Sequence, residues 1–427
     1  MMNAILLEEL KNLSPDGWEV TETKTAAWEF YFIGHKLDQH RVREVTHVNV
    51  RVFRKTDDML GEASAELAPT LSQPEVKKAL ENLWYEASLA PVPAYRLVQP
   101  APMEAAEPVD EPIEVTARRC LEAVAAAAET AGESVNSYEI FVKRDTEHLM
   151  NSEGVDVTQQ IPGMMCEVVV NARRGGHEIE IYRMIRGGLC DAPSLTKEVE
   201  AAMRVGKNRL TALPTPVTGE MPVLLSTEAV VDVCRYFLNN VGAAYIYRKM
   251  SPFEIGRPLC EKADGDAVTL RALRTLPNSS QNRVCDDEGS PVHDVELIKD
   301  GIPAHYWGGR MYAEWLGLSD AFRVTNWEVE GGAQSAAELW QGPYLEPVEF
   351  SDFQVDAMTG DIFGEIRLAW YHDGTRMIPV TGGSLSGNMR EAMKQMRFSK
   401  EQKQYDCARV PQVVRFEKLT VAGAMSS

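Results

Sequence analysis

The sequence predicts an α+β protein with an N-terminal and a middle domain, each of helix, antiparallel strands and helix, followed by a mostly antiparallel, β-rich C-terminal domain. Three observations predict this arrangement. The chain has 427 residues, too many for one ordinary core. A proline-rich acidic stretch interrupts its first half, and β-rich segments with glycine turns dominate after residue 280. We expect domains at 1–95, 113–213 and 218–424, with a linker at 96–112.

The N-terminal domain begins with a short helix that the turn sequence Ser14-Pro15-Asp16-Gly17 ends. Alternating or β-rich segments then indicate half-buried strands, and the spacing of Val76, Leu80 and Leu83 is typical of a helix. The expected elements are a helix at 4–13, strands at 18–22, 26–33, 45–54 and 61–67, and a helix at 74–88.

The stretch 96–112 contains four prolines and four acidic residues but no aromatic residue. Such a composition forms no packed element, so we expect a linker stiffened by its prolines. The middle domain repeats the plan of the first, which predicts a structural repeat without evident sequence identity. Its expected elements are a helix at 115–131, a strand at 137–144, a hairpin at 147–159 turning near 153–154, strands at 164–172 and 178–185 around the loop 173–176, and a helix at 194–212.

The C-terminal domain is expected to open with a short strand at 223–225 and a helix at 226–240. Further on, Asp300-Gly301 and Asp373-Gly374 each lie between β-rich segments, as in hairpins with tight turns. The last third of the chain therefore predicts mostly antiparallel β structure.

The composition argues against nucleic-acid and membrane partners. The formal net charge is −19, and this excess repels phosphate backbones. Seven scattered cysteines without a CxxC pair indicate reduced thiols. The first residues predict no signal peptide, and no stretch reaches the ~18–20 apolar residues of a membrane span. We therefore expect a cytoplasmic protein.

The residues by themselves present no complete active site. None of the eight histidines forms an HExxH pattern; His177-Glu178 comes closest, but position 181 is isoleucine. The sequence also lacks a nucleophile elbow, a nucleophilic cysteine signature and a phosphate-binding loop. The acidic run Asp286-Asp287-Glu288-Gly289 lacks the ligand alternation of a calcium loop, and we expect a turn with solvated carboxylates.

Seven short motifs, in order and with similar spacing, resemble the TldD/PmbA family, once labelled modulators of DNA gyrase. They cover residues 151–423, whereas residues 1–110 match only in their helix–strand–helix plan. The resemblance implies a C-terminal domain of TldD/PmbA type. The motifs are Asn-Ser-Glu-Gly at 151–154, a stretch ending in Tyr-Arg-Lys at 244–249, Asp-Glu-Gly-Ser-Pro at 287–291, Leu-Ile-Lys-Asp-Gly-Ile at 297–302, Thr-Gly-Asp at 359–361, Gly-Asn-Met at 387–389 and Val-Ala-Gly at 421–423.

The resemblance also implies where a metal site would lie. TldD-type subunits hold zinc with His-Glu-x-x-x-His and a later cysteine, whereas PmbA-type subunits, also called TldE, lack the histidines. In this chain Thr227 and Asp232 stand at the histidine positions, around Glu228, and Cys407 lies near the place of the cysteine. One carboxylate and one thiolate are too few for tight zinc binding, and without zinc Glu228 has no water to activate. We expect these four positions to be vestigial, with no catalytic residue and no cofactor in this chain.

The implied role is a non-catalytic, PmbA-like (TldE-like) subunit of a heteromeric zinc metalloprotease that acts on unfolded or flexible peptides. The zinc would lie in a TldD-like partner. Two alternatives stay open. One is a homodimeric peptide-binding or scaffold protein without proteolysis. The other is a self-sufficient metallopeptidase whose atypical site uses Asp232, Cys407 and a histidine such as His293 or His305.

Overall fold

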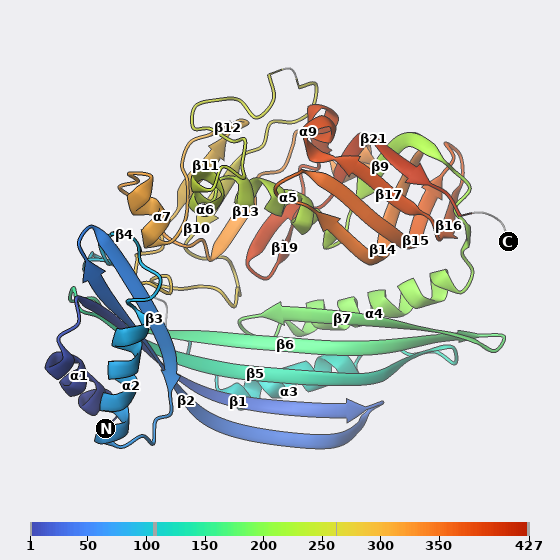
Figure 1. Ribbon diagram of the computed structural model, residues 1–427. Helices are drawn as coiled ribbons and strands as arrows, with labels where there is room; N and C mark the ends of the chain where they lie inside the picture. Colours follow the sequence, from blue (N-terminus) through green and yellow to red (C-terminus); the bar gives the residue numbers. More distant parts are fainter. Residues whose placement is uncertain (1, 106–108, 262, 425–427) are drawn as a thin grey trace.

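The computed structural model describes residues 2–105, 109–261 and 263–424 (Figure 1). None of the helices in these ranges has both the length and the apolar character that a bilayer crossing requires. The helices are α1 (Met2–Leu13), α2 (Gln73–Glu86), α3 (Ile113–Ala125), α4 (Ala192–Arg209), α5 (Ala229–Asn240), α6 (Ala243–Tyr247), α7 (Arg310–Trp315), α8 (Ala336–Leu339), α9 (Met389–Ala392) and the 3₁₀ helix η1 (Met393–Gln395).

The strands belong to three sheets, which are mostly antiparallel, and the predicted α+β fold is confirmed. The strands are β1 (Gly17–Ile33), β2 (Lys36–Thr56), β3 (Met59–Leu67), β4 (Val92–Pro93), β5 (Glu133–Asn151), β6 (Asp156–Arg174), β7 (His177–Gly187), β8 (Leu213–Pro214), β9 (Gly219–Leu225), β10 (Leu270–Leu273), β11 (Val295–Lys299), β12 (Ile302–Pro303), β13 (Asn326–Val329), β14 (Tyr344–Val355), β15 (Asp361–His372), β16 (Met377–Thr381), β17 (Ser384–Asn388), β18 (Met396–Phe398), β19 (Gln402–Tyr405), β20 (Ala408–Pro411) and β21 (Val414–Ala422).

The first half of the described chain forms a single seven-stranded antiparallel sheet in the order β4-β3-β2-β1-β5-β6-β7. Its centre is the β1–β5 ladder, which runs from Glu19 opposite Asn151 to Ile33 opposite Ser137. Figure 1 shows these long strands side by side beneath the C-terminal domain. Because β1 precedes the stretch 96–112 and β5 follows it, the two units on either side of the expected linker share one sheet.

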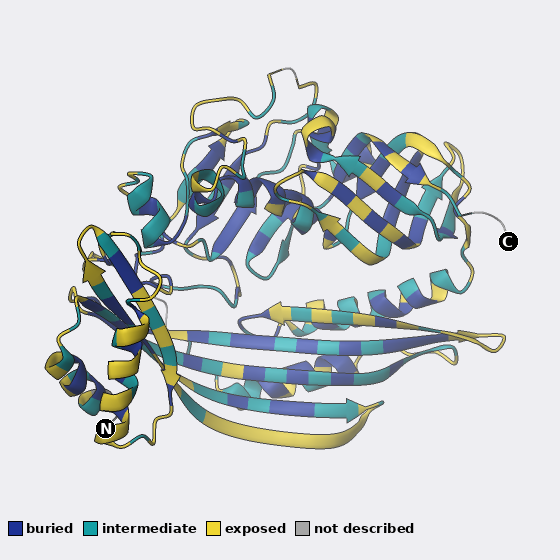
Figure 2. Ribbon diagram, viewed as in Figure 1, coloured by how far each residue is buried: buried dark blue, intermediate teal, exposed yellow. Residues whose placement is uncertain are grey.

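The expected repeat is present within this sheet. α1, β1, β2, β3 and α2 are followed by α3, β5, β6, β7 and α4, and the strand order is symmetric about the β1–β5 ladder. Buried and exposed residues alternate along the long strands (Figure 2), so each half has an apolar face for its helix pair to cover. Leu6, Val50 and Leu80 pack together in the first half, and Ile140 and Val199 pack together in the second.

Several expected boundaries differ from the structure, and two of them have a clear physical cause. The segments 18–22 and 26–33 form one continuous strand, β1, because ladders with β2 on one side and β5 on the other extend through the polar residues between them. The helix expected at 115–131 corresponds to α3, which ends at Ala125, six residues before the expected end. There the Glu129 carboxylate accepts the backbone N–H of Val135 at 2.8 Å, which favours a turn into β5 over a longer helix.

The C-terminal domain contains the other two sheets. In its described part, six strands pair in the order β12-β11-β10-β13-β20-β19. In the second sheet β14, β9, β21, β17 and β15 pair in sequence, and β14 also pairs with β15, which closes these strands into a ring. The hairpins expected at 300–301 and 373–374 are present as β11–β12 and β15–β16. α5 contacts both β14 and β20, so it joins the cores of the two sheets.

The expected linker is docked onto the folded domains. Residues 94–105 and 109–112 contain no helix or strand, yet Leu97 and Val98 are buried. Leu97 packs against Phe53 of β2, and Val98 belongs to a second small cluster on the sheet. The three-part division of the chain stays a prediction.

A substitution at Gly61 on β3 tests how closely the end of α2 packs against the sheet. A Cβ at Gly61 would lie 1.6 Å from the carbonyl oxygen of Ala87, the residue after α2. Gly61→Ala therefore forces the strand and the helix end apart, and we expect the free energy of unfolding to fall by about 1–3 kcal/mol. Denaturant unfolding measures this against Ser64→Ala, an exposed position on the same strand. Equal stability of the two variants would contradict the packing described.

Candidate functional site

The N-terminal end of α5 lies directly after β9. Thr227 occupies the bend between them, and Glu228 is an exposed residue at the helix N-cap. Backbone hydrogen bonds close the first turn: the N–H of Val230 donates to the carbonyl oxygen of Thr227 at 3.0 Å, and that of Val231 to Glu228 at 2.8 Å. The Glu228 carboxylate is therefore placed where it interacts favourably with the helix dipole.

Asp232 lies in the first turn of α5 and pairs with Arg235, whose Nη1 is 2.8 Å from Asp232 Oδ1. Burial raises the pKa of the Asp232 carboxyl; the Arg235 cation opposes this shift and the Glu228 carboxylate adds to it. The counter-charge of Asp232 is thus a guanidinium on its own helix.

Cys407 lies in the turn between β19 and β20, and β20 packs against α5. Burial raises the pKa of the Cys407 thiol, Asp406 adds to the shift, and the cations of Arg235 and Arg186 oppose it. The structure therefore brings Cys407 into the electrostatic range of the α5 residues. Because the thiolate is the form that binds metals, a raised pKa weakens Cys407 as a ligand.

The residues at these positions do not fit a zinc site. Thr227 is a poor ligand, Asp232 is already paired, and within the described ranges no group of three or more His, Cys, Asp or Glu side chains is placed to hold a metal ion. The two histidines of the alternative metallopeptidase hypothesis have other partners. His293 Nε2 is 3.0 Å from Asp320, and His305 Nδ1 is 2.7 Å from a backbone carbonyl oxygen.

The acidic run of the C-terminal domain is not the solvated turn that we expected. Asp286 and Glu288 are only 2% and 6% exposed, and Asp287 alone among the three acids faces solvent. Asp286 accepts the backbone N–H groups of Glu288, Ser290 and Arg323 at 2.8–3.0 Å. These donors replace water around the buried carboxylate, and the acidic pattern by itself does not reveal them.

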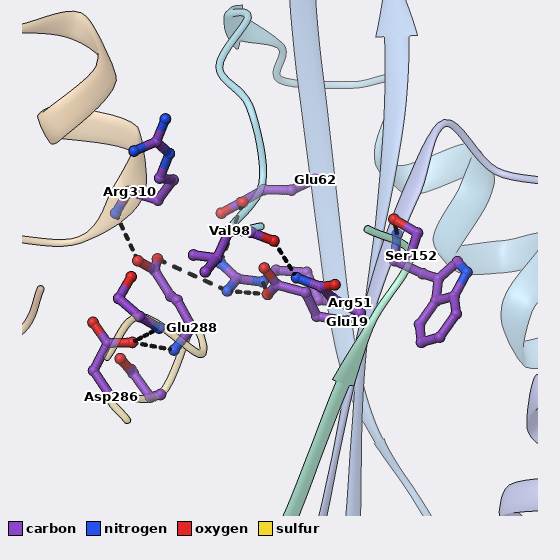
Figure 3. Close-up of polar contacts among 12 residues, drawn as sticks. Glu19, Arg51, Glu62, Val98, Ser152, Asp286, Glu288 and Arg310 are labelled. Atoms are coloured by element: carbon purple, nitrogen blue, oxygen red, sulfur yellow. Dashed lines mark hydrogen bonds and ion pairs between the residues drawn. The ribbon is translucent and has the colours of Figure 1, made fainter. Parts of the chain in front are cut away.

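Glu288 connects the C-terminal domain to the long sheet (Figure 3). Its Oε2 accepts the backbone N–H of Arg310 at 2.6 Å, and its Oε1 lies 3.2 Å from Arg323. The same Oε1 is 3.9 Å from Arg51 of β2, which donates two hydrogen bonds to Glu19 of β1. Alternating charges of Glu288, Arg51 and Glu19 therefore cross the contact between the C-terminal domain and the long sheet, which we call the joint.

This joint contains more carboxylates than guanidinium groups. Burial raises the pKa of Glu19 to about 7; Arg51 opposes the shift and Glu288 adds to it. Burial likewise raises the pKa of Asp286 to about 6, although the backbone N–H of Arg323 stabilises the ionised form. Ionising these groups is unfavourable because they are removed from water and lie near other carboxylates.

The Asn-Ser-Glu-Gly motif closes the β5–β6 turn beside the joint. Asn151 Oδ1 accepts the N–H groups of Glu153 and Val155, both at 3.0 Å, and its amide donates to the carbonyl oxygen of Val98 at 2.8 Å. Ser152 exchanges two hydrogen bonds with the start of β1. The motif thus ties the turn, the linker and the central strand together.

Residues 218–423 match the family model described as the PmbA/TldA metallopeptidase C-terminal domain. The C-terminal domain of this chain thus belongs to the TldD/PmbA family. The resemblance inferred from the seven motifs is thereby confirmed.

Two curated relatives are each 22% identical to this chain. An uncharacterised protein of Methanocaldococcus jannaschii aligns over 270 residues, 58% of this chain and 60% of that protein. The zinc metalloprotease TldD homolog of Saccharolobus solfataricus aligns over 275 residues, 63% of this chain and 58% of that protein. The alignments thus span about three fifths of each relative.

Solved structures share the whole fold. TldE from Thermococcus kodakarensis superposes with a TM-score of 0.79 at 17% identity, over 99% of this chain and 100% of that one. A proposed modulator of a DNA gyrase from Thermotoga maritima has a TM-score of 0.79 at 15% identity, over 99% of both chains. The predicted TldD/PmbA-type fold is confirmed, and the superposition includes the first 110 residues, which the motifs did not reach.

Sequence reasoning missed Arg235 and the Glu19–Arg51 pair. Arg235 follows Asp232 by three residues on a predicted helix, a spacing that brings side chains together and would have signalled the pair. Glu19 lies directly opposite Arg51 only in the register of β1 with β2. A pattern of alternation within each strand does not determine that register.

The raised pKa of Glu19 predicts a pH-dependent stability. Since this pKa is higher in the folded protein than in the unfolded chain, the unfolded state ionises first as the pH rises, and stability is lost between about pH 4.5 and pH 7. Glu19→Gln removes this titration. Relative to that variant, we expect the natural protein to lose up to about 3 kcal/mol across the interval, as measured by denaturant unfolding.

The matched control is Glu81→Gln on the exposed face of α2, whose stability should follow that of the natural protein at every pH. Parallel profiles for the natural protein and Glu19→Gln would show that the Glu19 pKa is not raised.

Proposed function

We propose that this chain is a non-catalytic, PmbA-like subunit of a heteromeric zinc metalloprotease that acts on unfolded or flexible peptides. The observation that carries the proposal is the pairing of Asp232 with Arg235 at a position where the family's catalytic subunits have a zinc-binding histidine. The Arg235 guanidinium already neutralises the Asp232 carboxylate. Thr227 and Cys407 then offer at most one good ligand, where a catalytic zinc needs about three.

A TldD-like partner would supply the zinc and the water that the zinc activates. The alignment with a relative named a zinc metalloprotease TldD homolog supports such a pairing within one family. In the assembly, this chain would complete the cavity and stabilise the partner. We place the complex in the cytoplasm because all seven cysteines of this chain are free thiols.

An extended peptide is the ligand that the C-terminal domain suits. β19 is an edge strand of its sheet within the described residues, and it leads into the turn that carries Cys407. An edge strand can bind a peptide through backbone hydrogen bonds, which tolerate many side-chain sequences. The substrate class therefore follows from main-chain geometry more than from a side-chain pocket.

Co-expression with a TldD-like protein from the same organism tests the proposal. We expect the chain alone to hold no stoichiometric zinc and to leave an unfolded peptide intact, because its own ligand set is incomplete. The co-purified pair should contain zinc and cleave. Metal analysis and a peptide-cleavage assay measure both properties. Zinc and cleavage in the isolated chain would instead establish the self-sufficient metallopeptidase. If the chain binds peptide but pairs with no TldD-like protein, it is a homodimeric peptide-binding or scaffold protein.

Restoring the histidines tests whether the four positions are vestigial. In Thr227→His/Asp232→His, two imidazoles and Cys407 provide three ligands of the types that zinc prefers. We expect the double variant to bind about one zinc ion per chain, whereas Thr227→His alone, which leaves the Asp232–Arg235 pair intact, should bind far less. Titration with zinc followed by calorimetry distinguishes them. Equal zinc binding by both variants would show that these positions do not form a metal site.

A further inference from the structure

A small pocket lies beside the C-terminal half of α5, away from the Thr227 end of the helix. Its lining consists of Tyr236 of α5, the loop residues 252–254 and 257–259, Arg390 of α9 and Met393 of η1. Its volume is about 230 Å³, below the ~300–1,000 Å³ of sites for drug-sized molecules, so it suits a small ligand. Tyr236 follows Glu228 by eight residues, about 12 Å along the helix axis, so the pocket is separate from the positions expected to be vestigial.

The loop that forms the apolar wall of the pocket is held in place by hydrogen bonds and ring contacts. Phe253 is buried, and its ring meets that of Tyr236 edge to face, with centroids 5.9 Å apart. Its carbonyl oxygen accepts the hydroxyl of Tyr306 at 3.1 Å. Further along the loop, the N–H of Leu259 donates to the carbonyl oxygen of Gly301, in the β11–β12 turn, at 2.8 Å. The wall is therefore formed before any ligand binds, which lowers the cost of binding.

The hydroxyl of Tyr236 has no hydrogen-bond partner among the described residues, although Tyr236 is only 1% exposed. Burying a hydroxyl without a partner is unfavourable, and most buried polar atoms have one. The Arg390 cation acts on the same group: burial raises the pKa of Tyr236, and the nearby guanidinium opposes the shift. The structure thus holds a buried O–H donor beside a cation, and an acceptor oxygen of a ligand would satisfy it.

Two of the family motifs position Arg390. Asn388 of the Gly-Asn-Met motif accepts the backbone N–H of Arg390 at 3.0 Å, and its amide donates to the carbonyl oxygen of Thr359 at 3.0 Å. Nη2 of Arg390 donates to the carbonyl oxygen of Met358, directly before the Thr-Gly-Asp motif, at 3.1 Å. Within the part of the chain that the structure describes, this guanidinium forms no ion pair with a carboxylate. Its charge is therefore available to an anion.

The lining of the pocket is positively charged in an otherwise acidic protein. Arg257 pairs with Glu254 at 2.8 Å, so these two exposed charges cancel and the charge of Arg390 is left over. Because the formal net charge of the chain is −19, an anion is repelled by the protein as a whole and attracted at this place. A guanidinium matches the planar geometry of a carboxylate, which can accept a further hydrogen bond from a hydroxyl.

We propose that this pocket binds a small carboxylate that carries a compact apolar group. The carboxylate pairs with Arg390 and accepts the hydroxyl of Tyr236, and the apolar group packs against Phe253 and Leu259. A free branched-chain acid and the C-terminal residue of a peptide both have this chemistry.

Titration of the full chain with 4-methylpentanoate tests the pocket, and the uncharged 4-methylpentanamide is the matched control ligand. We expect saturable binding of the acid and at least about tenfold weaker binding of the amide, because the amide forms no ion pair with Arg390. Ligand-observed NMR measures both dissociation constants. Absence of saturable binding of the acid, or equal binding of acid and amide, would overturn the inference.

The dipeptide N-acetyl-alanyl-leucine distinguishes the two sources of the carboxylate in the same titration. Tighter binding of the dipeptide than of 4-methylpentanoate would assign the pocket to peptide C-termini. Weaker binding would assign it to a free acid.

Tyr236→Phe separates a role in binding from a role in packing, because it removes only the hydroxyl. The free energy of unfolding should stay equal or rise, since the lost group is buried without a partner. The same variant should bind 4-methylpentanoate about three- to tenfold more weakly. Denaturant unfolding and the NMR titration measure the two effects. A destabilised variant with unchanged binding would show that the hydroxyl serves the fold and would contradict the inference.

Arg390→Gln should weaken binding of the acid at least about tenfold, because it removes the cation of the pair. Its control is Arg118→Gln on the exposed face of α3, which makes the same change of net charge away from the pocket and should leave binding unchanged. Equal weakening by both variants would reveal only a general electrostatic effect and would overturn the inference.

The inference goes beyond the proposed function and requires neither zinc nor a TldD-like partner, because the titrations use this chain alone. Failure to co-purify such a partner, with carboxylate binding that depends on Arg390, would contradict only the proposed function. A zinc-containing, active pair whose isolated subunit binds no carboxylate would contradict only the present inference.

Discussion

The antiparallel ladder between β1 and β5 is the constraint on which the rest of the structure depends. It joins two helix–strand–helix units that are separated in sequence by a proline-rich stretch, and it makes them one sheet. The same ladder places Glu19 opposite Asn151. It thus brings the charged start of β1 and the Asn-Ser-Glu-Gly turn to the end of the sheet that the C-terminal domain contacts.

At that end, the protein tolerates buried carboxylates in excess of their cations. Glu19, Asp286 and Glu288 are nearly inaccessible, while Arg51 and Arg323 supply the nearby positive charge. Backbone N–H groups make up part of the difference, as they do around Asp286. Burying such groups is costly unless each is hydrogen-bonded, so the geometry of this joint is strongly specified and sensitive to protonation.

The α5 helix uses different faces for packing and for its polar residues. Its position between the two C-terminal sheets depends on apolar residues such as Phe237, which face the core. Its polar residues face the other way, and there a guanidinium now neutralises Asp232. Because these two faces are separate, substitutions among the polar residues leave the packing of the helix unchanged.

The sequence by itself determined the fold class, the repeated helix–strand–helix plan, the tight hairpins and the family, because these follow from local periodicity, turn residues and ordered motifs. It also located Thr227, Glu228 and Asp232 on one helix end. Only the tertiary structure decided that the two repeats share a sheet, that Asp286 and Glu288 are buried, and that Glu19 meets Arg51. Those facts depend on strand register and on contacts between residues far apart in the chain, which no local pattern specifies.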